Sequence, residues 1–427
     1  MSGAARVMRS SWAPVLVLLI LVAGVFLGDH LISSHAFDQN LFHIQVVRQF
    51  EMQWPAPDLS DYSAATGPLY HLVMVALGAV FGNELGTLRV LSVIFGVGLV
   101  MVVSGVAGRF TDSRAAAFLT MPLAASIYVV GSATHVHTDD FAWMASALCI
   151  ACVLFSQRCP KILLVASLSM FVAVAARQNF IWLAGPVLFA GLLDLGRERS
   201  SSAWKGLLAL VAVIMPSIAI LITFIVLWGG LVPPHFQGFH VSTGINWIAP
   251  GYALGLLGLY APFFLLAVPE SVSLLRKNVG MLCVAAVVGV LCILIPVSAP
   301  EIASGRTGGP LWTLSGLLVV ADRSIPLAFF AGFGAASLVF FGLAISSVKA
   351  SRSWLILLCA LVASTVTQMA NAQSFQRYFD TPTLLFLCWT LAMILGDRKD
   401  AVGRASTGPA LLTVVLASLL VVRLVAF

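Results

Sequence analysis

Apolar runs of membrane-spanning length recur from one end of this chain to the other. Because a helix needs about 20 predominantly apolar residues to cross a bilayer, these runs predict about thirteen crossings. Only 9% of the 427 residues are charged, against roughly 25% in soluble domains. We therefore expect an all-α polytopic membrane protein, with residues 1–427 in a single transmembrane domain, and not a soluble enzyme or a disordered chain. The runs lie at 12–28, 88–108, 115–132, 141–156, 161–176, 180–194, 205–228, 251–268, 279–298, 326–347, 354–371, 381–396 and 409–427.

Two short apolar runs, the N-terminal segment and the cysteines are also consistent with a polytopic membrane protein. Two apolar runs, 68–82 and 311–321, are too short to cross comfortably, so we expect helices in or near the membrane interface. Residues 1–28 resemble a signal peptide, but no clear small-residue cleavage pattern follows, so an uncleaved first span is expected. The seven cysteines are odd in number and almost all lie in apolar runs, which predicts no disulfide framework.

The distribution of basic residues fixes the sides of this arrangement. With the N-terminus inside, 16 of the 23 lysines and arginines fall in inner segments, as expected when positive charge is retained in the cytoplasm. Counting 68–82 as a further crossing would place most later basic loops outside. The 16 are Arg6, Arg9, Arg109, Arg114, Arg158, Lys161, Arg197, Arg199, Lys205, Arg276, Lys277, Lys349, Arg352, Arg398, Lys399 and Arg404.

The outer segments carry most of the chemically reactive side chains. The long ones are 29–87, 229–250 and 299–325, and the first is the richest in polar and aromatic residues. The predicted sides place 11 of the 17 acids and all eight histidines outside. The histidines are His30, His35, His43, His71, His135, His137, His235 and His240. We therefore look for function on the outer face.

Asp38 opens the first outer segment, directly beyond the first span. A carboxylate at a span end can act as general base for a sugar hydroxyl. A solvated loop acid or a helix cap is the alternative. Trp54, Tyr62 and Trp247 could offer faces to a sugar, although packing of loop aromatics at the interface explains them more simply.

A second cluster reads His135-Val136-His137-Thr138-Asp139-Asp140. Asp139 and Asp140 could bind a metal, contact sugar hydroxyls, or cap the helix that follows. Histidines such as His137 could also ligate a divalent cation, but the spacing identifies no third ligand. The metal, if any, stays unknown at this level.

Three outer arginines lie near span ends: Arg177, Arg323 and Arg377. A guanidinium there can bind a phosphate in a forked geometry, or it can anchor the span and pair with a nearby acid. The segment 305–310 has free amides that could cradle an anion, but loop flexibility explains its glycines more simply. Together, a carboxylate and phosphate-binding arginines beside lipid favour a lipid-phosphate-linked substrate.

The ordered motifs resemble a known family, the dolichyl-phosphate-glucose-dependent alpha-1,2-glucosyltransferases of the GT-C superfamily. That family's first loop reads Asp-Glu-x-Phe-His-Ile-Pro-Gln-x-x-Arg-Tyr. Asp38, Gln45 and Arg48 keep the same mutual spacing, whereas Phe42-His43-Ile44 is displaced by one residue. Gln39 stands where the family has Glu, and the family's Pro is missing.

Further matches follow in the same order along the chain. Five more segments of this chain resemble family motifs. The segment ending at Tyr70 resembles Thr-x-Pro-Gly-Leu-Tyr, and the one ending at Asp139 resembles Tyr-Thr-Asp. The segments around Arg177, Arg323 and Arg377 resemble Phe-Arg-Gln-Thr-Asn-Ile-x-Trp, Ala-Asp-Asn-Arg and Pro-Arg-Tyr-Phe. The resemblance spans residues 38–379. No single match is specific, and the ordered set is moderately so.

The resemblance implies a membrane glycosyltransferase that takes a monosaccharide from a polyprenyl-phosphate or dolichyl-phosphate donor. We expect a hexose, with glucose one candidate, and inverting transfer to a glycan or lipid-linked acceptor on the extracytoplasmic face. Asp38 would be the base, and Arg377, Arg177 and Arg323 would hold the donor phosphate. His43, Gln45, Arg48 and Tyr70 would belong to the first-loop motif.

Alternatives remain at the sequence level. A related enzyme could transfer a pentose or aminosugar to lipid A, protein or cell-wall glycan. A secondary transporter or flippase is the alternative from another class, although such proteins usually show repeats and mid-membrane charges. We expect a bacterial inner membrane rather than the endoplasmic reticulum, and no nucleic-acid partner.

Overall fold

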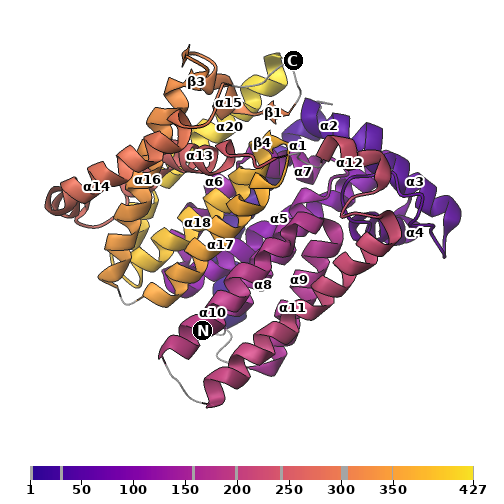
Figure 1. The fold of residues 1–427 in the computed structure, drawn as a ribbon, viewed down its shortest axis with the longest axis horizontal. Helices are drawn as coiled ribbons and strands as arrows, with labels where there is room; N and C mark the ends of the chain where they lie inside the picture. Colours follow the sequence, from indigo (N-terminus) through magenta and orange to yellow (C-terminus); the bar gives the residue numbers. More distant parts are fainter. Residues whose placement is uncertain are drawn as a thin grey trace. The chain divides into compact units, whose positions relative to one another are not determined.

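The structure, a computed structural model, describes residues 3–28, 32–155, 159–197, 201–240, 244–299, 306–348 and 350–426. The chain is an integral multi-pass membrane protein built from α-helices, as the composition predicted (Figure 1). Among the described residues, ten helices are long and apolar enough to cross a bilayer, or up to eleven if one bent pair counts as a single span. All seven cysteines are free, in agreement with the prediction of no disulfide framework.

The predicted number of thirteen crossings is wrong. The runs 141–156 and 161–176 form α8 (Asp139–Phe155) and α9 (Pro160–Ala176), each of 17 residues and therefore short for a span. The run 115–132 is broken into α6 (Ser113–Ala124) and α7 (Ile127–Thr134), which meet at 72°. Ser126 starts α7, because its hydroxyl accepts a hydrogen bond from the Tyr128 amide. Periodicity in the sequence does not reveal such breaks.

The chain divides into two compact units by its internal contacts. Unit 1 comprises Met1–Pro14, Val103–Leu123 and Val241–Val415, and unit 2 comprises Val15–Val102, Ala124–His240 and Leu416–Phe427. Four helices contribute residues to both: α1 (Gly3–Leu27), α5 (Leu85–Phe110), α6, which gives only Ala124 to unit 2, and α20 (Gly408–Ala426). We describe each unit by itself.

Unit 2 contains the first predicted outer segment folded into short helices. In it α3 packs on α4 and α4 on α9, while α8, α9 and α11 pack in succession. A tight approach joins Gly67 to α9: its amide donates to the Ala176 carbonyl at 2.9 Å, and a Cβ there would lie 2.1 Å from the Ala175 oxygen. The remaining elements are α2 (Ser33–Asp38), the π-helical turn η1 (Gln39–His43), α3 (Ile44–Gln53), α4 (Leu69–Phe81), the 3-10 helix η2 (Gln178–Leu183), α10 (Ala184–Arg197), α11 (Ser201–Trp228) and α12 (Pro234–His240).

Unit 1 is built around α18 (Arg377–Leu395), whose side chains from Tyr378 to Leu395 are all buried. Helix α16 packs on α13 and α14. Gly258 and Gly334 permit the first of these contacts, because a Cβ at either one would lie 1.9 Å from a carbonyl oxygen of the other helix. The remaining elements are α13 (Ile248–Leu265), α14 (Ser271–Leu294), α15 (Pro310–Ser315), α16 (Ile325–Ser346), α17 (Ser351–Met369), α19 (Ala401–Ala405), and strands β1 (Thr307–Gly308), β2 (Val319–Val320), β3 (Arg323–Ser324) and β4 (Ser374–Phe375).

Three short segments that the sequence places outside differ in how they fold. The run 68–82 does form a helix, α4, whereas 311–321 forms only the short α15 followed by β2, which pairs antiparallel with β3. The glycine-rich segment 305–310 is not simply a flexible loop, because Thr307 and Gly308 pair in parallel with Ser374 and Phe375. Gly305 itself lies outside the described residues.

Candidate active site

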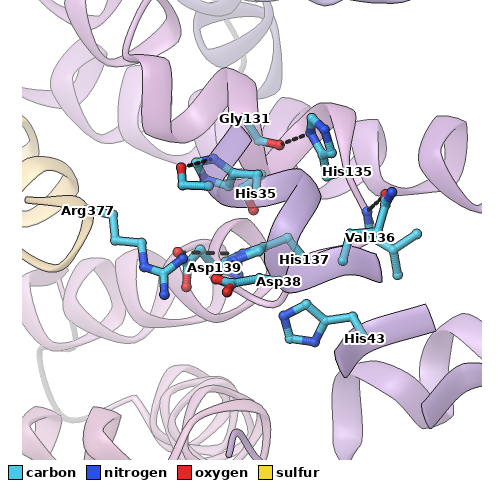
Figure 2. Close-up of polar contacts among 12 residues, drawn as sticks. His35, Asp38, His43, Gly131, His135, Val136, His137, Asp139 and Arg377 are labelled. Carbon is cyan, nitrogen blue, oxygen red and sulfur yellow. Dashed lines mark hydrogen bonds and ion pairs between the residues drawn. The ribbon is translucent and has the colours of Figure 1, made fainter. Parts of the chain in front are cut away.

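The end of α2 and the segment before α8 bring Asp38 and His137 together. His137 is buried, and its Nε2 lies 3.5 Å from Oδ2 of the half-buried Asp38. Figure 2 shows the two side chains meeting although they lie far apart in the sequence. The sequence predicted each as a site residue but gave no reason for this contact.

The proton position on His137 follows from its neighbours. The backbone amide of Asp139 can only donate, and it donates to His137 Nδ1 at 3.3 Å. In the neutral ring the proton therefore sits on Nε2, which donates to the Asp38 carboxylate. A carboxylate held in this way is oriented by a histidine, as in other acid–base sites.

Asp139 forms the second polar contact of the cluster. One of its oxygens pairs with the guanidinium of Arg177, and its Oδ2 lies 3.5 Å from His137 Nδ1. Arg177 follows the end of α9 in extended conformation, where α9 stops and η2 begins. The acid and the arginine, both predicted, therefore meet. Asp139 and Asp140 occupy the first turn of α8, where the helix dipole favours negative charge.

Buried bonds hold His137 in place. The Tyr70 hydroxyl accepts from the His137 amide at 2.9 Å and lies 3.0 Å from Ser92 Oγ. Because Ser92 donates its own proton to the Leu88 carbonyl, Tyr70 donates to Ser92. The buried Gln39 amide oxygen accepts from the Val136 amide at 2.9 Å. Tyr70 and Gln39 thus fix the backbone at His137 and at the residue before it.

A chain of hydrogen bonds reaches His43 from deeper in unit 2. The Tyr62 hydroxyl donates to the Gly67 carbonyl at 3.0 Å and lies 2.8 Å from His71 Nδ1. His71 Nε2 in turn lies 2.9 Å from His43 Nδ1. Tyr62 is buried and stacks on Trp228, so its ring offers no face to a sugar, contrary to that prediction. Trp54 and Trp247 remain exposed.

His35, His137 and Asp139 form a group that could hold a metal ion. One candidate ligand atom from each lies within 4.8 Å of the other two, and all three residues are buried. His35 packs directly on α7, because a Cβ at Gly131 would lie 2.5 Å from its ring atoms. Two imidazoles and a carboxylate suit a first-row divalent cation, so the donor set fits such an ion. The spacing within residues 135–140 did not identify His35 as a third ligand, because His35 belongs to a different segment.

Other polar atoms of unit 2 are buried without partners. Asp140 Oδ2, Thr138 Oγ1 and His135 Nε2 have no hydrogen bond among the described residues. His135 Nδ1 donates to the Gly131 carbonyl at 2.9 Å, so its Nε2 carries a lone pair. Burial lowers the pKa of His135 to about 4, against the raising effect of the Gly131 bond. Such unpaired buried groups are rare in proteins and call for an explanation.

The remaining predicted residues lie elsewhere. Gln45 and Arg48 are exposed on α3, and Gln45 donates to the Asn40 carbonyl. Arg323 and Arg377 belong to unit 1. The Arg323 guanidinium donates to four backbone carbonyls, those of Leu294, Ile295, Ala321 and Asp322. Arg377 lies over the rings of Phe375 and Tyr378. Their predicted binding of donor phosphate stays a prediction.

Sequence reasoning missed His35, His71 and Tyr62 as members of the cluster. One signal was available: all eight histidines fell in predicted outer segments. Of these, His35, His43, His71, His135 and His137 gather in unit 2, with ring centroids of successive neighbours 5.0 to 6.1 Å apart. His30 lies outside the described residues. Their mutual order could not be inferred, because it depends on contacts between distant segments.

Comparisons with known proteins give a fold but no family. No protein-family profile and no curated protein matches the chain. The oligosaccharyltransferase of Archaeoglobus fulgidus in its apo form matches with a TM-score of 0.52 and 15% identity, over 96% of this chain and 56% of that one. This chain therefore spans little more than half of that enzyme's length, and the two share a fold.

Two further structures match less closely. ArnT from Cupriavidus metallidurans matches in the apo state with a TM-score of 0.38 and 14% identity, over 88% of this chain and 76% of that one. The same protein bound to undecaprenyl phosphate matches with a TM-score of 0.42 and 15% identity, over 93% and 77%.

Proposed function

We propose that this protein is a glycosyltransferase of the GT-C type, which transfers a monosaccharide from a polyprenyl-phosphate donor to a hydroxyl group of a glycan or lipid-linked acceptor. One observation carries the proposal: Asp38, His137, Asp139 and Arg177 form one contiguous cluster in unit 2. The shared fold with a membrane oligosaccharyltransferase supports the superfamily level of the resemblance.

The cluster supplies the groups that inverting transfer needs. Asp38 takes the proton of the acceptor hydroxyl, while His137 Nε2–H holds its Oδ2. The acceptor oxygen forms a bond to the anomeric carbon of the donor. The bond from that carbon to the phosphate oxygen breaks, and the polyprenyl phosphate leaves with the electron pair. Attack opposite the leaving group inverts the configuration.

Arg177 is the proposed ligand of the departing phosphate. Its guanidinium pairs with Asp139, but it has five N–H donors and can contact further oxygens. Positive charge placed where negative charge develops is commonly the largest catalytic contribution. The pairing with Asp139 also keeps the guanidinium oriented before the donor arrives.

His35, His137 and Asp139 are the proposed ligands of a divalent cation. His137 would use the Nδ1 lone pair, in place of its 3.3 Å contact with the Asp139 amide, and its Nε2–H would stay on Asp38. A cation would supply additional positive charge near the donor phosphate. The proposal is tested by equilibrium dialysis of the purified chain with Mn²⁺ or Zn²⁺. Binding that is unchanged in a His35→Ala variant would remove His35 from the ligand set.

The sugar and the acceptor are proposed from the resemblance. We favour a hexose, with glucose first, over a pentose or aminosugar destined for lipid A, protein or cell-wall glycan. Radiolabelled polyprenyl-phosphate hexoses, offered to membranes with extracted glycolipids, test this choice. Transfer from a pentosyl or aminosugar donor alone would establish the alternative. No transfer from any polyprenyl-phosphate sugar, together with substrate movement across vesicles, would establish the transporter.

We propose that the cluster faces the extracytoplasmic side, in a bacterial inner membrane. The crossing count bears on this side. With the bent pair α6–α7 counted as one span, loss of α8 and α9 removes two successive crossings, and the predicted sides of the later loops stay the same. Without that pair three crossings disappear, and the later sides are reversed. The native Cys159 in the α8–α9 turn reports the difference. In a background without other cysteines, labelling from the cytoplasmic side shows that both helices cross, and labelling from outside shows that neither does.

A further inference from the structure

We propose that His43 is a fixed hydrogen-bond acceptor beside Asp38, which positions a substrate hydroxyl for proton removal. The inference rests on the proposed function for the identity of the hydroxyl. Its structural part, the state and direction of the His43 ring, stands on geometry alone. Three independent features of unit 2 lead to it.

The first feature is the π-helical turn η1. The Ile44 amide donates to the Gln39 carbonyl, five residues back rather than four. In a regular α-helix, at 3.6 residues per turn, a residue five positions after Asp38 would lie about 140° around the helix axis. The wider turn instead brings His43 round to the side that bears Asp38. Figure 2 shows the His43 ring on the same side as Asp38 and His137.

The second feature is the chain of bonds that sets the tautomer. The Gly67 carbonyl can only accept, so the Tyr62 hydroxyl donates to it. The oxygen of Tyr62 then accepts from His71 Nδ1–H. In neutral His71, Nε2 has the lone pair and accepts from His43 Nδ1–H. The lone pair of His43 is therefore on Nε2.

The third feature is the surroundings of the ring. His43 is 4% exposed, and its centroid lies 5.0 Å from that of His137 in an edge-on arrangement. Because Nδ1 of His43 is engaged by His71, the ring presents Nε2 as its remaining polar atom.

A histidine used only for packing would differ in one respect. Loss of a distant partner could still change its tautomer, but that change would not alter substrate binding. Here the far end of the chain is anchored, because the Gly67 amide is itself bonded to the Ala176 carbonyl, next to Arg177. The relay Gly67–Tyr62–His71–His43 thus ties the acceptor to the segment that carries Arg177.

The tautomer is tested by ¹⁵N NMR of the full chain labelled at histidine, in nanodiscs. His43→Gln and His71→Gln variants assign the two signals. We expect both rings to be protonated at Nδ1 and unprotonated at Nε2. Tyr62→Phe should release His71 and give a mixture at His43. A proton on Nε2 of His43 in the unaltered chain would overturn the inference, whether or not the chain has transferase activity.

The role is tested by kinetics. Loss of one positioning hydrogen bond, about 1 kcal/mol, corresponds to roughly a five- to tenfold change. His43→Ala should therefore raise the KM for the acceptor about tenfold and leave the KM for the donor unchanged, and His43→Gln should recover part of the loss through its amide oxygen. His235→Gln, at an exposed histidine of α12, is the matched control and should have no effect. Equal changes in both KM values, or no change in either, would contradict the role.

Discussion

The buried polar groups of unit 1 and unit 2 are used in different ways. In unit 1, the buried Asp380 accepts from Tyr260, and the half-buried Arg323 donates to two carbonyls at the end of α14 and to the Ala321 and Asp322 carbonyls. In unit 2, the described contacts leave Asp140 Oδ2 and His135 Nε2 buried without partners. An unpaired buried group costs about 1–3 kcal/mol. Such a cost is typical of sites that bind a ligand or carry out chemistry.

This difference separates residues that hold the fold from residues available for function. In unit 1 the ionisable side chains Asp380 and Arg323 complete bonds within the protein, and the buried atoms without partners in its described part include two hydroxyls and an indole N–H, at Thr307, Thr390 and Trp354. In unit 2 the unpaired buried atoms include the ionisable groups of His135 and Asp140, next in sequence to His137 and Asp139. The predictions below test the contrast by pairing each change in unit 2 with a control of similar chemistry.

The largest effect is expected for Asp38→Asn. Loss of the base should lower the rate of transfer by about 10² to 10⁴, with no fall in melting temperature because Asp38 is half-buried and at a helix end. Asp380→Asn is the control: it should lower stability by about 1 kcal/mol and retain transfer. Rates and melting curves in the same detergent distinguish them. Full activity of Asp38→Asn would remove the proposed base.

Arg177→Lys should come next. Lysine keeps the charge opposite Asp139 but loses the planar fork, so donor affinity should fall about tenfold to a hundredfold, the equivalent of one or two charged hydrogen bonds. Arg404→Lys, at the exposed ion pair with Asp400 in unit 1, is the matched change, and we expect it to leave donor affinity unaltered. Titration with a polyprenyl phosphate measures both. An equal loss of affinity in the two variants would contradict the contrast between the units.

Gly131→Ala should weaken cation binding about tenfold without removing any ligand. Changes to residues that support metal ligands commonly lower metal affinity 10- to 100-fold. The added methyl group would meet the His35 ring and displace it. Gly86→Ala, where nothing lies within 4 Å of a built Cβ, is the control. Chelation should lower the transfer rate of the unaltered chain. Unchanged dialysis curves in Gly131→Ala would exclude His35 as a ligand.

A smaller, opposite effect on stability is expected for Asp140→Asn. Removing a buried carboxyl that has an unpaired oxygen should leave stability unchanged or raise it by up to about 1 kcal/mol, while transfer falls if that oxygen contacts substrate. Functional sites often show such a trade-off between stability and activity. A loss of stability comparable to that of Asp380→Asn would show that Asp140 holds the fold.

The smallest effects are expected for Gln45→Ala and Arg48→Ala. Both side chains are exposed on α3, and exposed substitutions usually stay within about 0.5 kcal/mol. Their match to the family motif predicts a role, whereas their exposure favours a minor one. The transfer rate of the double variant tests whether the two side chains contribute to the reaction. A tenfold loss of rate would show that they belong to the site.

Composition and periodicity predicted the helical membrane fold because burial in lipid demands apolar residues wherever a span lies. The same reasoning overcounted at 115–132, where Ser126 starts a new helix inside an apolar stretch. It also overcounted at α8 and α9, which polar residues shorten at Asp139 and Arg177. Hydropathy measures lipid preference but does not locate the local bonds that end helices.

The site was predicted in parts. Asp38, His137, Asp139 and Arg177 could be chosen by residue type and motif order, but their contacts depend on packing between distant segments. His35 and Tyr62 were missed as partners for the same reason. The exposed Gln45 and Arg48 show the converse: a motif match gives spacing along a chain, and only the helix phase tells which side chains face inward.

The π-helical turn has a consequence for recognising relatives of this protein. A turn of this kind adds one residue to a helix and still keeps its ends in line. The interval between Asp38 and His43 is therefore set by the turn as well as by the sequence. A sequence pattern that tolerates one residue more or less after Asp38 would allow for such a turn, whereas a pattern with rigid intervals would not.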